Sequence, residues 1–316
     1  MSLIRLGISR CLLGDHVRYD GQHKHDQFLT DTLGRYVEYI GVCPEVECGL
    51  HVPRESMSLV GSVDTPRLMT RENRRDLTRQ MLEWVTAKLS SMEKESFCGF
   101  IFKSKSPSCG IDRVKVYSSN GMPVGSTSGL FAREFMKKFP LLPVEDEGRL
   151  HDPEIRENFL DRIFTLNRYR EAVAGGRTSG GLMKFHAEHK LLLMAHSEKH
   201  CREMGRLLAR SSEGLSLVGF RTKYETLLMN GLKCMGTVKK HVNVLQHMLG
   251  YFRKLISSDE RQEMVDIINQ YAKGNLPLIV PLTLFRHYVR KYKVGYLDGQ
   301  YYLRPHPVEQ MLKNHV

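Results

Sequence analysis

The sequence lacks every feature that would place it in a membrane or outside the cell. None of its apolar runs approaches the eighteen or so residues of a membrane-spanning helix. Residues 1–8 carry one basic residue and a short apolar run, without the apolar core and cleavage site of a secretory signal. We therefore predict a cytoplasmic protein with no membrane partner.

The cysteine spacings of common metal-binding motifs are also missing. The seven cysteines are an odd number spread over 316 residues, and none has the C-x-x-C spacing of a structural zinc site or the clustered spacing of a ferredoxin. A reducing compartment would keep them as thiols, so the pattern argues against a disulfide scaffold. Metal or catalytic chemistry and simple burial in the core both stay open for these thiols.

Apolar residues and positive charge, by contrast, are plentiful. Hydrophobic residues make up 41% of the chain at a mean hydropathy of −0.35, which is typical of a folded protein rather than a disordered one. The length favours two domains.

The net charge is +12, and the residues after 184 contribute +9 of it. An anionic partner, nucleic acid before membrane, is therefore expected to bind the C-terminal half.

Hydrophobic periodicity predicts a mixed α/β part at the start of the chain. Strand-length apolar runs alternate with amphipathic helical patterns, which is typical of an α/β domain with a Rossmann-like arrangement. The predicted elements are strands at 4–8, 37–42 and 97–102, a helix over 71–89, a hairpin or loop over 114–129 and a helix over 130–138, with the domain closing near 144–147.

The rest of the chain has helical patterns only. A helix over 152–173 leads to a glycine-rich break over 174–181, and long amphipathic patterns follow. We predict an α/β domain over 1–150, a helical and glycine-rich connector over 151–184, and a basic all-α domain over 185–316. The helices of that last domain are predicted at 190–208, 221–229, 238–256 and 261–269, with Pro277 and Pro281 marking a stop.

Three cysteines are placed where an α/β sheet binds ligands. Cys11 comes just after the first predicted strand, Cys43 directly after the second, and Cys109 in the loop after the third. Ligands of open α/β sheets bind at the carboxyl ends of the strands, so we expect these thiols at one edge. Cys98 is interpreted as a buried strand thiol, and Cys201 and Cys234 are also interpreted as structural.

The loops around these cysteines resemble a known family when they are taken in order. They read Cys11-Leu-Leu-Gly with Arg18-Tyr-Asp-Gly downstream, then Cys43-Pro-Glu-Val-Glu followed by Pro53-Arg, then Lys103-x-x-Ser-Pro-Ser-Cys-Gly. In content and order they are similar to the thiouracil desulfidase (TudS) domain, over about the first 150 residues.

The remainder of the chain, with the segment Phe185-His-Ala-Glu-His-Lys, resembles a helical domain of formerly unknown function. That domain follows the TudS domain in a two-domain form, and the pairing looks like the tRNA 4-thiouridine desulfidases (RudS). The resemblance therefore implies a protein that acts on tRNA or thiolated RNA, with no DNA partner.

The resemblance implies a [4Fe-4S] cluster with three cysteine ligands, which are Cys11, Cys43 and Cys109 in this chain. One iron would then lack a protein ligand and bind the thiocarbonyl sulfur of 4-thiouridine. Water would add at the base carbon, and uridine and hydrosulfide would result. Cys48 stands where the long relatives carry an aliphatic residue, so its role as a ligand is doubtful.

Glu45 is the predicted acid or base of this hydrolysis, because it lies two residues after the ligand Cys43. A loop or helix-capping carboxylate is the alternative, and the resemblance favours catalysis. Glu47 is interpreted as structural.

Four further residues are predicted to act near the cysteines. Ser106 is predicted as a second catalytic group and Ser108 as a substrate contact, although both hydroxyls could instead bind local turn amides. Arg18 and Lys103 are predicted to bind phosphate or carbonyl oxygens of the substrate.

A stacked or tertiary-packed thiobase must be extruded or locally unfolded to reach such a site, and the helical half is predicted to hold the rest of the RNA. Basic residues interleaved with aromatics suit RNA, although a charge run on a helix is also typical of a solvated face. The predicted RNA-binding residues are Lys190, Arg202, Arg206, Lys239, Lys240, Arg286 and Arg290. Further candidates are Lys199 and Arg210 on the same long helix as Lys190, and Lys291 and Lys293, which with Arg286 and Arg290 lie near Tyr288, Tyr292 and Tyr296.

A histidine series in the same half allows two interpretations. His186, His189, His196 and His200 would lie near one face if a single helix ran through them, which would suit a second metal site. Packing, hydrogen bonding or RNA contact is the favoured interpretation.

Two other functions remain open from the sequence. The same chemistry could act on free thiouracil or thionucleosides, with the helical half mediating dimerisation, and tight salt-dependent RNA binding would argue against that function. A non-catalytic RNA-binding or redox-sensing protein is the second, with the cysteines as a sensor cluster or zinc site. Glu45 beside a three-cysteine set favours catalysis.

Overall fold

The computed structural model describes residues 4–174, 179–209, 216–305, 309 and 311–312. The chain divides into two compact units, one up to Phe159 and one from Leu160 onwards, and each is described by itself. None of the helices in the described ranges is both long and apolar enough to span a bilayer.

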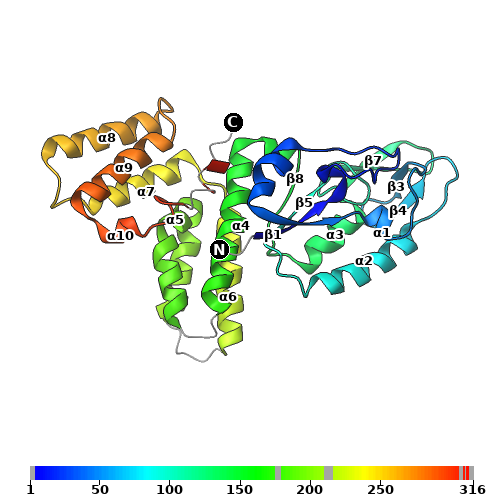
Figure 1. The fold of residues 1–316 in the computed structure, drawn as a ribbon, viewed down its shortest axis with the longest axis horizontal. Coiled ribbons are helices and arrows are strands. Elements are labelled where there is room, and N and C mark those ends of the chain that lie inside the picture. Colours follow the sequence, from blue (N-terminus) through cyan, green and yellow to red (C-terminus); the bar gives the residue numbers. More distant parts are fainter. Residues whose placement is uncertain (1–3, 175–178, 210–215, 306–308, 310, 313–316) are drawn as a thin grey trace. The chain divides into compact units, whose positions relative to one another are not determined.

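A four-stranded parallel sheet organises the first unit (Figure 1). Its strands are β1 (Ile4–Ser9), β2 (Val37–Val42), β5 (Gly99–Phe102) and β8 (Val144–Asp146), in the order β2-β1-β5-β8. All three pairings are parallel, which explains why β1 and β5 are nearly continuous apolar runs buried on both faces. The carboxyl ends of the four strands therefore meet at one edge.

A second sheet of four strands lies in the same unit. It has the order β4-β3-β6-β7 and consists of β3 (Met57–Gly61), β4 (Pro66–Thr70), β6 (Val114–Tyr117) and β7 (Pro123–Thr127). The predicted hairpin over 114–129 is confirmed as β6 and β7, whereas β3 and β4 were not predicted. Both missed strands are only five residues long, and turns rather than helices flank them.

The start of the predicted helix over 71–89 is wrong. Helix α2 (Thr78–Met92) begins seven residues later, because the preceding segment folds back on β4. There the amide of Arg75 donates to Thr70 Oγ1 at 2.9 Å, and Asp76 forms an isolated bridge with Met69.

Aromatic rings fill the core beside the parallel sheet. Phe100 and Phe102 on β5 stack at 4.1 Å, and both meet Phe131 and Phe135 edge-on. The last two belong to α3 (Leu130–Lys138), which confirms the helix predicted there. The short helical elements of this unit are a 3-10 turn over Arg10–Leu13, α1 (Pro44–Glu47), a π-helical turn over Phe28–Thr32, and 3-10 turns over Leu33–Arg35 and Arg149–His151.

The second unit contains helices and, among its described residues, no strands, so the predicted fold class is confirmed. Helix α4 begins in the first unit and continues into the second. The helices are α4 (Pro153–Ala174), α5 (Ser179–Ala209), α6 (Leu217–Leu232), α7 (Val238–Gly250), α8 (Ser258–Ala272), α9 (Ile279–Tyr292) and α10 (Gly295–Asp298).

Three details of the helical prediction need correction. Pro281 does not stop a helix but lies in the first turn of α9. Amide groups in a first turn have no hydrogen-bond acceptor within the helix, so proline, which has no amide hydrogen, is tolerated there. Helix α7 ends at Gly250, six residues before the predicted end. Helix α5 begins within the glycine-rich segment, whose residues 175–178 lie outside the described ranges, and it is kinked at Ser197, where the backbone is extended.

Candidate active site

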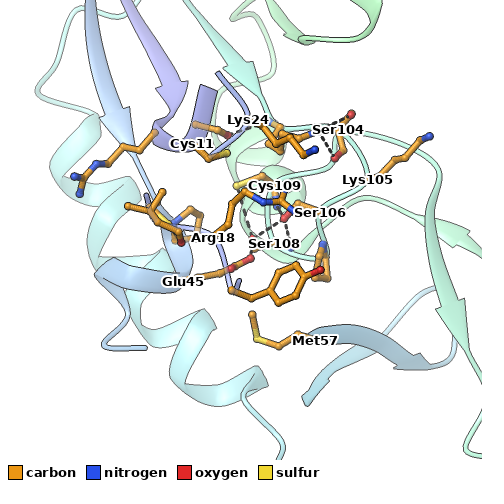
Figure 2. Close-up of a pocket in the computed structure, with 18 of the residues that line it drawn as sticks. Cys11, Arg18, Lys24, Glu45, Met57, Ser104, Lys105, Ser106, Ser108 and Cys109 are labelled. Carbon is orange, nitrogen blue, oxygen red and sulfur yellow. Dashed lines mark hydrogen bonds between the residues drawn. The ribbon is translucent and has the colours of Figure 1, made fainter. Parts of the chain in front are cut away.

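Three cysteines that are far apart in the chain line one pocket of the first unit (Figure 2). Cys11 follows β1, Cys43 follows β2 directly, and Cys109 lies in the loop after β5. These strands are neighbours in the parallel sheet, so the predicted placement at one sheet edge is confirmed. The pocket has a volume of about 380 Å³, within the range of small-molecule sites.

Burial dominates the chemistry of the three thiols, all of which are free. It raises the pKa of Cys11 to about 12, the pKa of Cys43 above its usual value, and the pKa of Cys109 well above its usual value. A thiolate at Cys43 would raise the pKa of the other two further, by charge repulsion. A bound metal centre would supply the positive charge that thiolate forms need here.

The donor set suits a cluster better than a single metal ion. In the described ranges, no three His, Cys, Asp or Glu side chains are grouped closely enough to hold one ion. Thiolates that hold a four-iron cluster each bind a different iron, so they surround the group rather than converge on one point. Three buried free thiols around one pocket therefore fit such a cluster.

Glu45 is held at the pocket by two side chains from other loops. It lies in α1, and one carboxylate oxygen accepts a hydrogen bond from Ser108 Oγ at 2.8 Å. The other oxygen forms an ion pair with Arg54, whose guanidinium also donates to Val17 O at 2.9 Å. Glu45 is thus not a capping carboxylate but a nearly buried group aimed at the pocket, as the close-up shows (Figure 2).

Arg54 is the partner of Glu45 that the sequence analysis missed. Its side chain is 8% exposed, so an unpaired charge there would be unfavourable, and Glu45 neutralises it. The signal was present in the sequence, because Arg54 belongs to the loop motif that carries the family resemblance. Nothing in the spacing, however, indicates that its partner is Glu45.

The two serines beside Cys109 have different environments. Ser108 is 1% exposed and links Glu45 to the cysteine loop, with its hydroxyl 3.7 Å from Cys109 Sγ. Ser106 Oγ accepts hydrogen bonds from the amides of Ser108 and Cys109, at 3.3 and 3.2 Å. Ser106 therefore forms the local turn that was its alternative interpretation, and it reaches Glu45 only through Ser108 at 3.0 Å.

The predicted substrate-binding cations line the pocket, but both have acidic partners. Lys103 forms an ion pair with Glu147, and Arg18 lies 3.3 Å from Asp20. Burial raises the pKa of Glu147, but the hydrogen bond and charge of Lys103 outweigh that effect and leave the pKa below its usual value. Their roles toward a substrate stay predictions.

Two neighbours of the site have structural contacts. Cys48 is not among the pocket-lining residues, and its thiol donates to Glu45 O at 3.2 Å. Glu47 accepts from the Cys43 amide at 2.9 Å and binds Lys88 at 2.8 Å, so it holds the start of α1.

The predicted RNA-binding residues fall on three helices of the second unit. Lys190, Arg202 and Arg206 lie on α5, Lys239 and Lys240 on α7, and Arg286 and Arg290 on α9.

Several of these cations form hydrogen bonds or ion pairs within the protein. Lys240 Nζ donates to the carbonyls of His196 and Met235, both at 2.7 Å, and Arg286 Nε donates to Leu303 O at 2.5 Å. Arg202 pairs with Glu198 at 2.5 Å. Lys239, Arg206 and Arg290 are exposed, whereas Arg210 lies outside the described residues.

The tyrosines near these cations also differ from one another. Tyr288 is buried and donates to Glu263 at 2.7 Å, and Tyr292 donates to Glu260. Tyr296 is 38% exposed and stacks on the equally exposed Tyr251 at 5.0 Å.

The histidine series does not form a metal site among the described residues. Each ring forms a hydrogen bond with a different group. The partners are Tyr224 OH for His186, the Arg168 guanidinium for His189, Cys234 O for His196 and Ser197 Oγ for His200. The kink at Ser197 also breaks the single helix on which their alignment depended.

Comparison with known proteins places both parts of the chain. Residues 6–147 match the 2-thiouracil desulfurase family, and residues 190–307 match a family of unknown function, DUF1722. The uncharacterized protein YbgA of Escherichia coli K12 is 33% identical over 151 residues, which cover 48% of this chain and 89% of YbgA. A solved structure titled as the [4Fe-4S]-dependent thiouracil desulfidase TudS aligns with 27% identity and a TM-score of 0.38, over 47% of this chain and 94% of that one.

The chain thus joins a 2-thiouracil desulfurase domain to a DUF1722 domain. It belongs to the family of YbgA, 89% of which it covers at 33% identity.

Proposed function

We propose that this protein is a [4Fe-4S]-dependent desulfidase that hydrolytically converts 4-thiouridine in tRNA to uridine and hydrosulfide. The observation that carries the proposal is the pocket where three buried thiols meet the Glu45–Ser108 pair. Membership of its first part in the 2-thiouracil desulfurase family supports the carbon–sulfur chemistry.

Cys11, Cys43 and Cys109 would hold the cluster. When bound, an iron–sulfur cluster with an iron that lacks a protein ligand supplies a soft Lewis acid for a thiocarbonyl sulfur.

Glu45 is the group that moves protons in the proposed reaction. Replacing a thiocarbonyl by a carbonyl consumes one water, forms one carbon–oxygen bond and breaks the carbon–sulfur bond, with hydrosulfide and a proton as the other products. The Glu45 carboxylate takes a proton from the attacking water. Arg54 forms an ion pair with one oxygen of that carboxylate and Ser108 donates a hydrogen bond to the other, so the two side chains fix its orientation.

The second unit supports an RNA substrate rather than a free base. The residues after 184, which contribute +9 of the net charge, belong to this part of the chain, and it presents exposed cations at Lys239, Arg206 and Arg290. Tyr251 and Tyr296 form an exposed aromatic stack of the kind that receives unpaired bases. Neither a free thiobase nor a nucleoside would need such a surface.

The test is desulfuration of bulk tRNA by the anaerobically purified full chain. Iron and sulfide content establish the cluster, and loss of the near-ultraviolet absorbance of 4-thiouridine reports the reaction. Wild type is expected to remove this absorbance and Cys109→Ala is not. A loaded enzyme that consumes only free thiouracil or thiouridine would overturn the tRNA assignment, and a protein without iron would overturn the cluster.

A further inference from the structure

The kink at Ser197 turns helix α5 back on itself. Cys201 Sγ lies 3.8 Å from Lys190 O. Further from the kink, a Cβ built on Gly205 would lie 3.7 Å from His186 Nε2. In a straight helix, residues 186 and 205 would be about 28 Å apart along the axis. The two halves of α5 therefore run antiparallel and lie against each other, with the extended Ser197 at the turn.

A pocket of about 730 Å³ lies along this folded helix, within the second unit. Residues from both halves of α5 line it, and α7 and α10 contribute His247 and Tyr296. Met194 and Leu208 give it buried apolar walls. The volume is that of a small-molecule site, and the reaction proposed for the first unit does not use this pocket.

Gly205 keeps part of the pocket open. Glycine makes a helix interior less stable than alanine does, so a glycine within α5 calls for a reason. Close packing of the two halves is not that reason, because a Cβ there would meet only the His186 ring, at an ordinary contact distance. Since Gly205 is one of the lining residues, a longer side chain there would occupy the pocket.

Lys190 brings a positive charge without an acidic partner to this pocket. The residue is half-buried and forms no ion pair with the residues that the structure describes. Glu198, the acidic residue of the lining, binds Arg202 at 2.5 Å instead. Burial, and after it the charge of Lys190, lowers the pKa of two lining rings, His186 to about 4 and His247 below its usual value. The ammonium group therefore lies near these rings and is available to an anionic ligand.

Aromatic rings form the edge of the pocket on α7 and α10. Tyr296 lines the pocket and stacks at 5.0 Å on Tyr251, which is not a lining residue. The His247 ring meets Tyr251 edge-on at 5.6 Å. Both tyrosines are more than a third exposed, so this edge offers a braced surface on which a flat ring can stack.

We infer that this pocket binds a nucleotide, with the base against Tyr296 and the phosphate at Lys190. The base matches the aromatic edge, and the phosphate supplies the negative charge that Lys190 lacks. Two sources offer this chemistry, an unpaired nucleotide of a bound RNA and a free mononucleotide. Only the first source rests on the proposed action on tRNA.

Calorimetric titration of the full chain with adenosine 5′-monophosphate tests the pocket without any turnover. The probe is a purine, so it does not resemble the pyrimidine that the first unit is proposed to convert. Tyr296→Leu is expected to weaken binding about tenfold, the size of one base–aromatic stack. The monophosphate should bind more tightly than adenosine, and Lys190→Gln should remove this difference. Lys254→Gln, an exposed lysine of the same unit outside the pocket, is the matched control.

Gly205→Leu distinguishes a ligand pocket from a structural gap. Leucine favours a helix more than glycine does, so the midpoint of thermal unfolding should stay the same or rise. The added side chain should at the same time abolish the heat of nucleotide binding. A lower midpoint with unchanged nucleotide binding would overturn the pocket.

Filter binding of tRNA identifies the source of the nucleotide. Weaker tRNA binding by Tyr296→Leu and Lys190→Gln assigns the pocket to an unpaired nucleotide of RNA. Unchanged tRNA binding, with loss of adenosine 5′-monophosphate binding, assigns it to a free mononucleotide. If both variants bind both ligands as Lys254→Gln does, the inference is overturned and the proposed desulfidase stands. Failure to desulfurate any substrate would overturn the proposed function, and the titration would still decide whether this pocket binds a nucleotide.

Discussion

At the residue scale, the central feature is a carboxylate held by two partners of different chemistry. Arg54 binds one oxygen of Glu45 with a charge, and Ser108 binds the other with a hydroxyl. A group held on both oxygens has a fixed direction, which general acid–base catalysis requires.

Glu45→Gln is expected to lower kcat on thiolated substrate roughly 100-fold, because the amide keeps the shape but cannot take a proton from water. It also leaves the buried Arg54 charge unpaired, so the variant should unfold at lower temperature. The double variant with Arg54→Gln should regain stability without regaining activity. Iron content should match wild type in both, and Glu83→Gln on the exposed face of α2 is the control.

The two serines of the cysteine loop should separate catalysis from loop structure. Ser108→Ala removes the hydrogen bond to Glu45, so kcat should fall about tenfold with little change in iron content. Ser106→Ala leaves two amides without their acceptor, so it should lower the free energy of unfolding by about 1 kcal/mol. Steady-state kinetics and denaturant unfolding distinguish the two, and equal kinetic effects would contradict this division of roles.

At the element scale, helix α3 braces the loop that carries Cys109. Its first amides are directed at that loop: Leu130 N donates to Pro107 O at 3.1 Å, and Phe131 N donates to Ser108 O at 3.0 Å. The loop carbonyls thus satisfy amides that a helix start leaves without partners. Gly129, just before the helix, lies so close to the loop that a Cβ there would be 2.5 Å from the Ser108 carbonyl carbon.

Gly129→Ala is therefore expected to displace the cysteine loop rather than to unfold the domain. The clash is with backbone atoms, which cannot rotate away. We expect at least a twofold loss of iron per chain, measured after anaerobic reconstitution, with the far-ultraviolet circular dichroism unchanged. Gly250→Ala at the end of α7, where a Cβ meets nothing within 4 Å, is the control and should load normally.

The sequence predicts those elements whose signal is local. The three main parallel strands are mostly apolar runs of strand length, and α3 has clear helical spacing, so both appear where expected. The strands β3 and β4 were missed because five-residue segments carry little periodic signal, and because β3, which pairs with β4, also pairs with β6 from a distant part of the chain. The site residues divide in the same way. The cysteines and Glu45 could be predicted from the motifs of their loops, whereas the ion pair between Glu45 and Arg54 could be found only in the folded structure.

At the scale of the whole molecule, buried histidines make stability depend on pH. Burial lowers the pKa of His186 to about 4 and the pKa of His189 well below its usual 6.5. Between about pH 4 and pH 6.5, these histidines bind protons in the unfolded chain but not in the folded chain. The contribution of these neutral rings to the free energy of unfolding is therefore fully present above about pH 6.5, and it is lost as the pH falls toward 4.

Urea unfolding of the full chain near pH 7 and near pH 5 should show this loss, and His186→Gln should reduce it. Glutamine keeps a hydrogen-bonding group beside Tyr224 OH but does not titrate. An unfolding free energy of wild type that is the same at both pH values would contradict the buried neutral state of these rings. The exposed His287→Gln on α9 is the control.

The uneven charge distribution should appear as salt-dependent tRNA binding. Lys239→Gln and Arg290→Gln, which remove exposed cations, should each make the slope of log K against log salt shallower by about 1. Lys240→Gln should instead reduce stability, because this ammonium binds two carbonyls of the protein. Filter binding across a salt series measures the slopes, and identical slopes for all three variants would refute the assignment.

The pocket with the three thiols is built from an early part of the chain. Every residue that lines the pocket lies between 9 and 109, and the helix that braces it ends at Lys138. Because domains fold as units as they leave the ribosome, the pocket can form while the helical half is still being translated. A metallocentre could therefore be inserted into the nascent chain, before any surface for a polyanion has been made.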